Sequence, residues 1–141
     1  MAKQTSLYLT KGHATAAATL TSANTSAWVT LYTAAADDAV IKALAGVSDS
    51  TAAITLRLGI DVAGAGTVRQ IATVIIPIAA GTNGTAPAID LLNSLDLPFL
   101  PVDRTGKRIL PLKGGDILKA AALATITTAK TLTLTALVEE Y

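Results

Sequence analysis

Residues 39–60 read AVIKALAGVSDSTAAITLRLGI and hold the most regular pattern in the chain. In the second half of the stretch, apolar residues alternate with Thr55, Arg57 and Gly59, a period of two that is typical of a half-buried β-strand. The first half, residues 39–47, is another apolar segment with β-branched residues, and the turn-forming residues 48–51 separate the halves. The pattern predicts two strands joined as an antiparallel hairpin.

Further segments of strand length lie on both sides of this stretch, at residues 26–33, 67–78, 108–112, 117–123 and 131–139. The first carries apolar residues on both faces and is expected to be buried on both sides. Pro77 lacks an amide donor, so its end of the strand is expected at a sheet edge. The turn at residues 113–116 predicts a second hairpin. About eight strands with short turns predict an all-β fold, a β-sandwich or jelly roll.

One segment departs from this pattern. Residues 89–97, IDLLNSLDL, place Leu91, Leu92 and Leu95 on one face at helical spacing, and Pro98 follows. A helical turn is expected there, because proline cannot continue a helix.

The first 25 residues are rich in Ala, Thr and Ser and contain few large apolar residues. They are expected to form an extended N-terminal arm, residues 1–25, that lies on the domain of residues 26–141 or on a neighbouring subunit. Such an arm gains order by pairing its backbone with an exposed strand edge, so Leu7, Tyr8 and Leu9 are candidate partner-binding residues. The strands that form the core are all expected to lie beyond the arm.

The composition favours a single domain that associates with other proteins. The 141 residues include 15% charged, 51% hydrophobic and 4% aromatic residues, and the net charge is +1. That charge predicts no binding to nucleic acid or to a membrane surface. A surface with so few charges is poorly protected against association, so part of it is expected to be covered by other subunits. The alternative is a monomer whose surface is rich in Ala and Thr. No signal peptide or membrane-spanning segment is expected.

The residues that usually carry catalysis are sparse. The chain has no cysteine, and its single histidine, His13, lies in the arm. Asp37 and Asp38 are adjacent, as are Glu139 and Glu140, but neighbours on a strand point to opposite faces. Neither pair is expected to act as an acid/base pair or to hold a metal. The sequence therefore predicts a protein without enzymatic activity, cofactor or metal.

Basic residues gather at one place, where Arg104, Lys107 and Arg108 flank a turn expected at residues 103–107. They are candidate partner-binding residues for an acidic surface. The alternative is a solvated turn.

Three segments follow one another in a recognisable order: residues 31–60, which contain Leu-Tyr-Thr-Ala before the long apolar stretch; residues 75–84, IIPIAAGTNG; and residues 109–137, in which Leu-x-x-Gly-Asp spans Leu112 to Asp116. This succession resembles small virion proteins of tailed bacteriophages. The resemblance covers roughly residues 27–138 and does not include residues 89–101. It implies a jelly-roll-like domain that assembles on the capsid or tail, often as a homotrimer.

Three functions compete on this basis. The first is a capsid decoration protein that binds the lattice of the major capsid protein as a symmetric oligomer within the virion. The second is a structural or adhesion module of a tail, neck or fibre. The third, a small enzyme or ligand carrier on a β scaffold, is disfavoured by the missing catalytic cluster.

Overall fold

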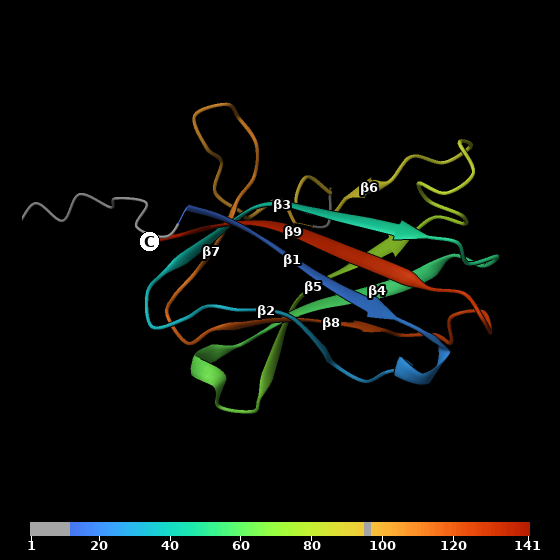
Figure 1. Ribbon diagram of the computed structural model, residues 1–141, viewed down its shortest axis with the longest axis horizontal. Helices are drawn as coiled ribbons and strands as arrows, with labels where there is room; N and C mark the ends of the chain where they lie inside the picture. Colours follow the sequence, from blue (N-terminus) through green and yellow to red (C-terminus); the bar gives the residue numbers. More distant parts are fainter. Residues whose placement is uncertain (1–11, 95–96) are drawn as a thin grey trace, which may run out of the picture.

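The computed structural model describes residues 12–94 and 97–141, which form a two-layer β-sandwich (Figure 1). The candidate residues Leu7, Tyr8 and Leu9 lie outside the described residues. The strands are β1 (Gly12–Leu20), β2 (Val29–Thr33), β3 (Ala39–Ser48), β4 (Ile54–Asp61), β5 (Val68–Ile76), β6 (Ile89–Asp90), β7 (Leu110–Leu112), β8 (Ile117–Ala122) and β9 (Leu132–Glu140). Two short 3-10 turns, η1 (Ser22–Asn24) and η2 (Val62–Gly64), lie between them. No helix in the described part of the chain has the length and apolarity needed to cross a membrane.

The order of the strands is that of a jelly roll. Sheet A has the order β1-β9-β3-β6, with β7 also paired to β3, and sheet B has the order β2-β8-β4-β5. Every pair of strands is antiparallel. The pairs are nested: β1 with β9, β2 with β8, β3 with β6 and β7, and β4 with β5. This nesting is the path of a long antiparallel ribbon wound into two sheets, so the expected all-β, jelly-roll-like fold is confirmed.

The predicted hairpin of residues 39–60 is wrong. Its two strands exist, but β3 lies in sheet A and β4 lies in sheet B, so they do not pair with each other. The polar residues between them carry the chain across the sandwich. Ser48 and Ser50 are each 1% exposed. The Ser48 hydroxyl donates to the Thr131 carbonyl at 3.1 Å and accepts the Ser50 amide at 3.1 Å, so the buried polar groups of the crossing are satisfied.

The second predicted hairpin is wrong for the same reason. β7 pairs with β3 in sheet A, whereas β8 pairs with β2 and β4 in sheet B. The turn at residues 113–116 is present and connects the two sheets. Gly115 donates its amide toward the carbonyls of Ala34 and Ala35, which ties this crossing to the β2–β3 connection.

The boundary of the arm also needs correction. β1 falls within the range expected for the arm, yet it pairs with β9 along its whole length, from Gly12 opposite Glu140 to Leu20 opposite Leu132. Ala18 is 8% exposed and Leu20 is fully buried. β1 is therefore a strand of the sandwich, and the sandwich includes residues well before Ser26. Small Ala and Thr side chains suffice at this edge because β9 supplies the larger core residues.

Burial follows the alternation read from the sequence on β9 but not throughout β4 and β2. On β4, Gly59 and Asp61 are buried and Ile60 is half-buried. In β9, Leu132, Leu134, Ala136 and Val138 are all buried, as expected. β2 was expected to be buried on both faces and is not: Thr30 and Thr33 are exposed, while Leu31 and Tyr32 are buried. A register shift between Thr30 and Tyr32 places these two neighbours inward together.

Of two further expectations, the edge position of β5 is confirmed and the helical turn at residues 89–97 is wrong. β5 ends at Ile76, directly before Pro77, and is an edge strand of sheet B, as expected. The helical turn at residues 89–97 is wrong for the described residues, which form β6 and then a turn closed by the Ser94 amide and the Leu91 carbonyl. Leu91, Leu92 and Leu97 are all buried, so the leucines fill the core from an irregular segment. Leu95 lies outside the described residues.

Candidate interaction surfaces

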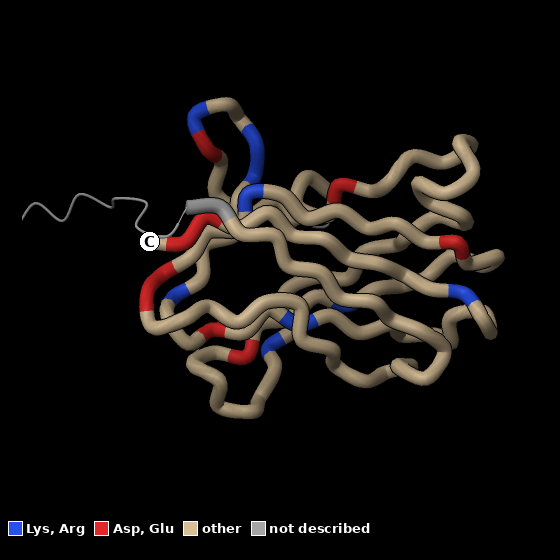
Figure 2. Tube along the Cα trace, in the orientation of Figure 1, with Lys and Arg blue, Asp and Glu red and all other residues tan. Residues whose placement is uncertain are grey.

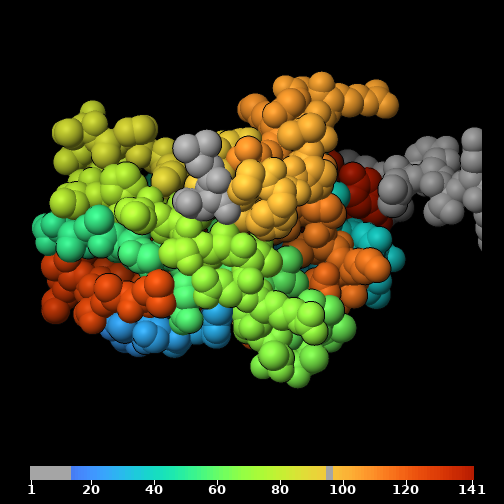
Figure 3. All heavy atoms as spheres, turned by 180° about the vertical axis from the view of Figure 1, so that it is seen from behind, coloured from blue at the N-terminus to red at the C-terminus, as the bar shows by residue number. Residues whose placement is uncertain are grey.

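Residues 101–109 form a projecting loop whose tip is closed by hydrogen bonds (Figures 1 and 3). One Asp103 carboxylate oxygen, Oδ1, accepts the Thr105 hydroxyl at 2.7 Å, the Thr105 amide at 2.8 Å and the Lys107 amide at 3.1 Å. These bonds, led by the one from the Thr105 hydroxyl, lower the pKa of Asp103 to about 2. A bridge between Val102 and Arg108 closes the loop. The expected turn at residues 103–107 is present.

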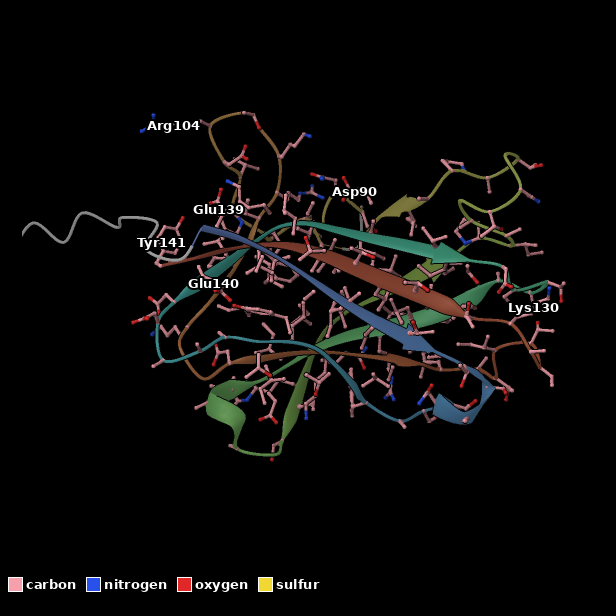
Figure 4. The ribbon with its side chains drawn as sticks, viewed as in Figure 1. Asp90, Arg104, Lys130, Glu139, Glu140 and Tyr141 are labelled. Atoms are coloured by element: carbon pink, nitrogen blue, oxygen red, sulfur yellow. The ribbon has the colours of Figure 1, made fainter. Side chains whose placement is uncertain are left out.

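The three basic candidates of this loop do not share one role. Arg104 and Lys107 are exposed, and the Arg104 side chain points away from the sandwich (Figure 4). Arg108 is half-buried, and its guanidinium donates to the Ser94 carbonyl at 2.7 Å. Arg108 therefore holds the loop on the body of the protein. Arg104 and Lys107 are the basic side chains that this loop presents to a partner.

The paired glutamates at the end of β9 point to opposite sides of the strand. The Tyr32 hydroxyl donates to Glu140 at 2.6 Å on the side of the core, whereas Glu139 lies 3.8 Å from Lys42 and accepts the Tyr141 hydroxyl at 3.3 Å. Burial, and then the contacts with the glutamates, raise the pKa of both tyrosines. The arrangement links the chain end to the sheets (Figure 4). It holds the tyrosines protonated and offers no activated nucleophile.

A recess of about 490 Å³ lies between β3, β7 and the end of the chain. Its apolar wall includes Val40, Pro111 and Leu112. Its two carboxylates are already engaged: Asp38 accepts the Gly114 amide at 3.0 Å, and Asp116 accepts the amides of Ala63 and Lys113 at 3.0 and 3.1 Å. Both acids therefore shape loops, and the recess suits an apolar or aromatic group better than a charged substrate.

The other acidic and histidine candidates do not form a chemical centre in the described residues. No group of three or more His, Cys, Asp or Glu side chains in residues 12–94 and 97–141 is placed to hold a metal ion. The side chain of His13 lies outside the described part.

The outward-facing side of sheet A carries no charged residue over the middle of β1, β9 and β3, although the exposed Asp90 of β6 flanks it beside Ala45. Its strands there consist of residues 15–19 of β1, 43–47 of β3 and 133–137 of β9, which are Thr, Ala, Gly, Val and Leu. Thr15, Ala17, Thr19, Thr135 and Leu137 are exposed. Charges lie at the two ends of these strands and, at Asp90, on the flank beside β3 (Figures 2 and 4). We call this surface the uncharged face of sheet A.

The outward-facing side of sheet B differs, because it bears interacting charges. Lys119 pairs with Asp61 at 3.3 Å, and Asp61 is 2% exposed. The Arg57 guanidinium lies 4.7 Å from the centre of the Trp28 ring and donates to the Ser26 carbonyl at 3.2 Å. Trp28 was expected in the core, but it is half-buried on this outer side, where it covers the sheet with Arg57.

No family model matches the sequence, and a search of curated proteins found no match. The uncharged face was not predicted as a surface, because it combines residues of β1 and β3 with residues of β9, which lie more than 80 positions further along the chain. The signal that could have found it is the absence of charge in each of its three segments.

Proposed function

We propose that this protein is a virion structural protein, a capsid decoration protein that binds the lattice of the major capsid protein as a symmetric oligomer. The observation that carries the proposal is the uncharged face of sheet A. Interface centres are depleted in charged residues, whereas a face that stays in water normally carries them. The outer side of sheet B differs, because it bears an ion pair and the Arg57–Trp28 contact, and charged residues are uncommon at interface centres.

The 101–109 loop supplies a second contact suited to an acidic surface. Arg104 and Lys107 are exposed on a turn whose geometry is set by Asp103. Two cations on a loop whose backbone is held by hydrogen bonds favour binding to carboxylates, because less backbone entropy is lost on contact. The jelly-roll order and the resemblance to small phage virion proteins support the same conclusion.

The test measures binding to capsids stripped of this protein. Arg104→Glu combined with Lys107→Glu should weaken binding at least tenfold, because two attractive contacts become repulsive. The matched control, Arg69→Glu with Lys130→Glu, changes the charge equally away from the loop, at the exposed Arg69 and the half-buried Lys130, and should bind as the wild type does. Equal binding by both double variants would contradict the role of the loop.

Copy number separates decoration from the alternative of a tail, neck or fibre module. A decoration protein is present in hundreds of copies per particle and follows the capsid lattice. A few copies at one vertex or on the tail would overturn decoration and favour the alternative.

A further inference from the structure

The four edges of this sandwich are unequally protected against pairing with another strand. Unpaired edges invite association, and proteins blunt them with short strands, bulges, charges or proline. β6 and β7 have two and three residues. β2 has five residues and a register shift. β5 is long, but its pairing contains a register shift, and it carries Arg69 near one end and ends before Pro77.

β1 has none of these features. Its nine residues, GHATAAATL, pair with β9 in unbroken register from Gly12 to Leu20 and include no Asp, Glu, Lys, Arg or Pro. Among the described residues, β9 is the one strand that pairs with β1. In Figure 1 β1 crosses the front of the molecule with no other element over it. The backbone groups on its free side are therefore available to a further strand.

We propose that β1 is a self-association edge, which pairs antiparallel with β1 of a second copy across a twofold axis and joins the two A sheets into one. The residues suit a self-pair. Around Ala16, Thr15 faces Ala17 of the second copy and Ala14 faces Ala18, so small side chains meet and no charge opposes a charge. The uncharged face of sheet A then continues across the axis, and the pair presents one surface of double width.

The dimensions are sufficient for a specific contact. Nine strand residues span about 30 Å, and two sheets about 10 Å apart with their outer side chains give a side about 20 Å deep. That side covers about 600 Å² on each partner, or about 1,200 Å² in total, the lower limit of stable protein interfaces. This inference rests on the proposed function, because it identifies the surface through which the proposed oligomer forms. Its test uses the isolated protein and no particles, so the β1 contact and the binding to capsids can be disproved independently.

The experiment places charges on β1 and measures mass in solution by light scattering. The wild type is expected at twice the 14.3 kDa of the chain, or at an even multiple of it. Thr15→Lys with Ala17→Lys changes exposed side chains and puts like charges across the axis, so the mass should fall by half. The matched control is Thr135→Lys with Leu137→Lys, at the exposed β9 positions opposite Ala17 and Thr15. Across the axis these lysines lie three strand spacings apart, about 14 Å, which is beyond the screening length at 0.15 M salt, so the control should keep the wild-type mass.

A charge swap completes the test and guards against misfolding. Thr15→Glu with Ala17→Glu should also have half the wild-type mass, and mixing it with the lysine variant should restore that mass, because opposite charges then face each other. A wild type that is monomeric at 100 µM, a mass unchanged by the β1 lysines, equal loss in the β9 control, or no recovery on mixing would each overturn the proposal.

Discussion

At the scale of single residues, one carboxylate organises the projecting loop of residues 101–109. Asp103 accepts three hydrogen bonds within the loop, and Lys42 lies 3.7 Å from its other oxygen. These contacts favour the ionised form, so they stabilise the loop above the ordinary pKa of 3.8 and are lost as the pH falls through about 2. Thr105→Ala removes the hydroxyl, which is the largest cause of the shift, and should raise the pKa of Asp103 toward 3.8. Carboxyl carbon shifts followed by NMR from pH 6 to 1.5 measure it. An unchanged titration would show that the backbone amides alone lower the pKa.

A second residue-scale prediction compares neighbours on β4. Leu56 is fully buried in the core, whereas Thr55 points to the outer side of sheet B and is half-buried. Leu56→Ala should lower the free energy of unfolding by about 2–5 kcal/mol, because a cavity remains in the core. Thr55→Ala should cost about 1 kcal/mol or less, since surface substitutions remove little packing. Urea denaturation measures both values. Equal losses would mean that the outer side of β4 is as tightly packed as the core.

At the scale of elements, part of the segment expected to be an arm forms strand β1 of the sandwich. It covers one edge of β9 and contributes Leu20 to the core. Removing residues 1–11 leaves every described strand in place and should change the thermal midpoint by a few degrees at most. Removing residues 1–20 deletes β1, exposes apolar residues of β9 and should abolish cooperative unfolding or lower stability by several kcal/mol. Thermal unfolding by circular dichroism compares the two truncations. A cooperative, wild-type midpoint after loss of residues 1–20 would show that β1 does not stabilise the sandwich.

At the scale of the whole molecule, the nested strand order makes the contacts strongly non-local. The first described strand pairs with the last, so residues about 120 positions apart must meet before sheet A is complete. Closing such loops costs entropy before the contacts form, and β-sandwiches therefore fold in milliseconds to seconds. Trp28, the single tryptophan, lies on sheet B and reports its formation. Stopped-flow fluorescence should show refolding in this range. Completion within microseconds would contradict a folding barrier set by topology.

Patterns local to the chain were sufficient to predict the all-β class, most strand positions and the edge position of β5. Alternation with a period of two is a property of each strand's own backbone, so Leu132, Leu134, Ala136 and Val138 could be assigned to one buried face. Composition likewise showed a shortage of charge. At the candidate surface, the exposed Arg104 and Lys107 followed from the turn residues around them.

The choice of strand partners depended on long-range packing. An amphipathic strand needs a covered face, but its pattern is satisfied equally by a hairpin neighbour or by a strand of the opposite sheet. Ser48 and Ser50 are typical of a hairpin turn in the sequence, yet they lie where the chain crosses from one sheet to the other. Their hydrogen bonds allow this crossing to be buried. Arg108 could be seen to differ from Arg104 only once Ser94 was placed beside it. Residues 12–20 form a strand because they pair with the edge of β9. The uncharged face exists because β1, β9 and β3 are neighbours in one sheet.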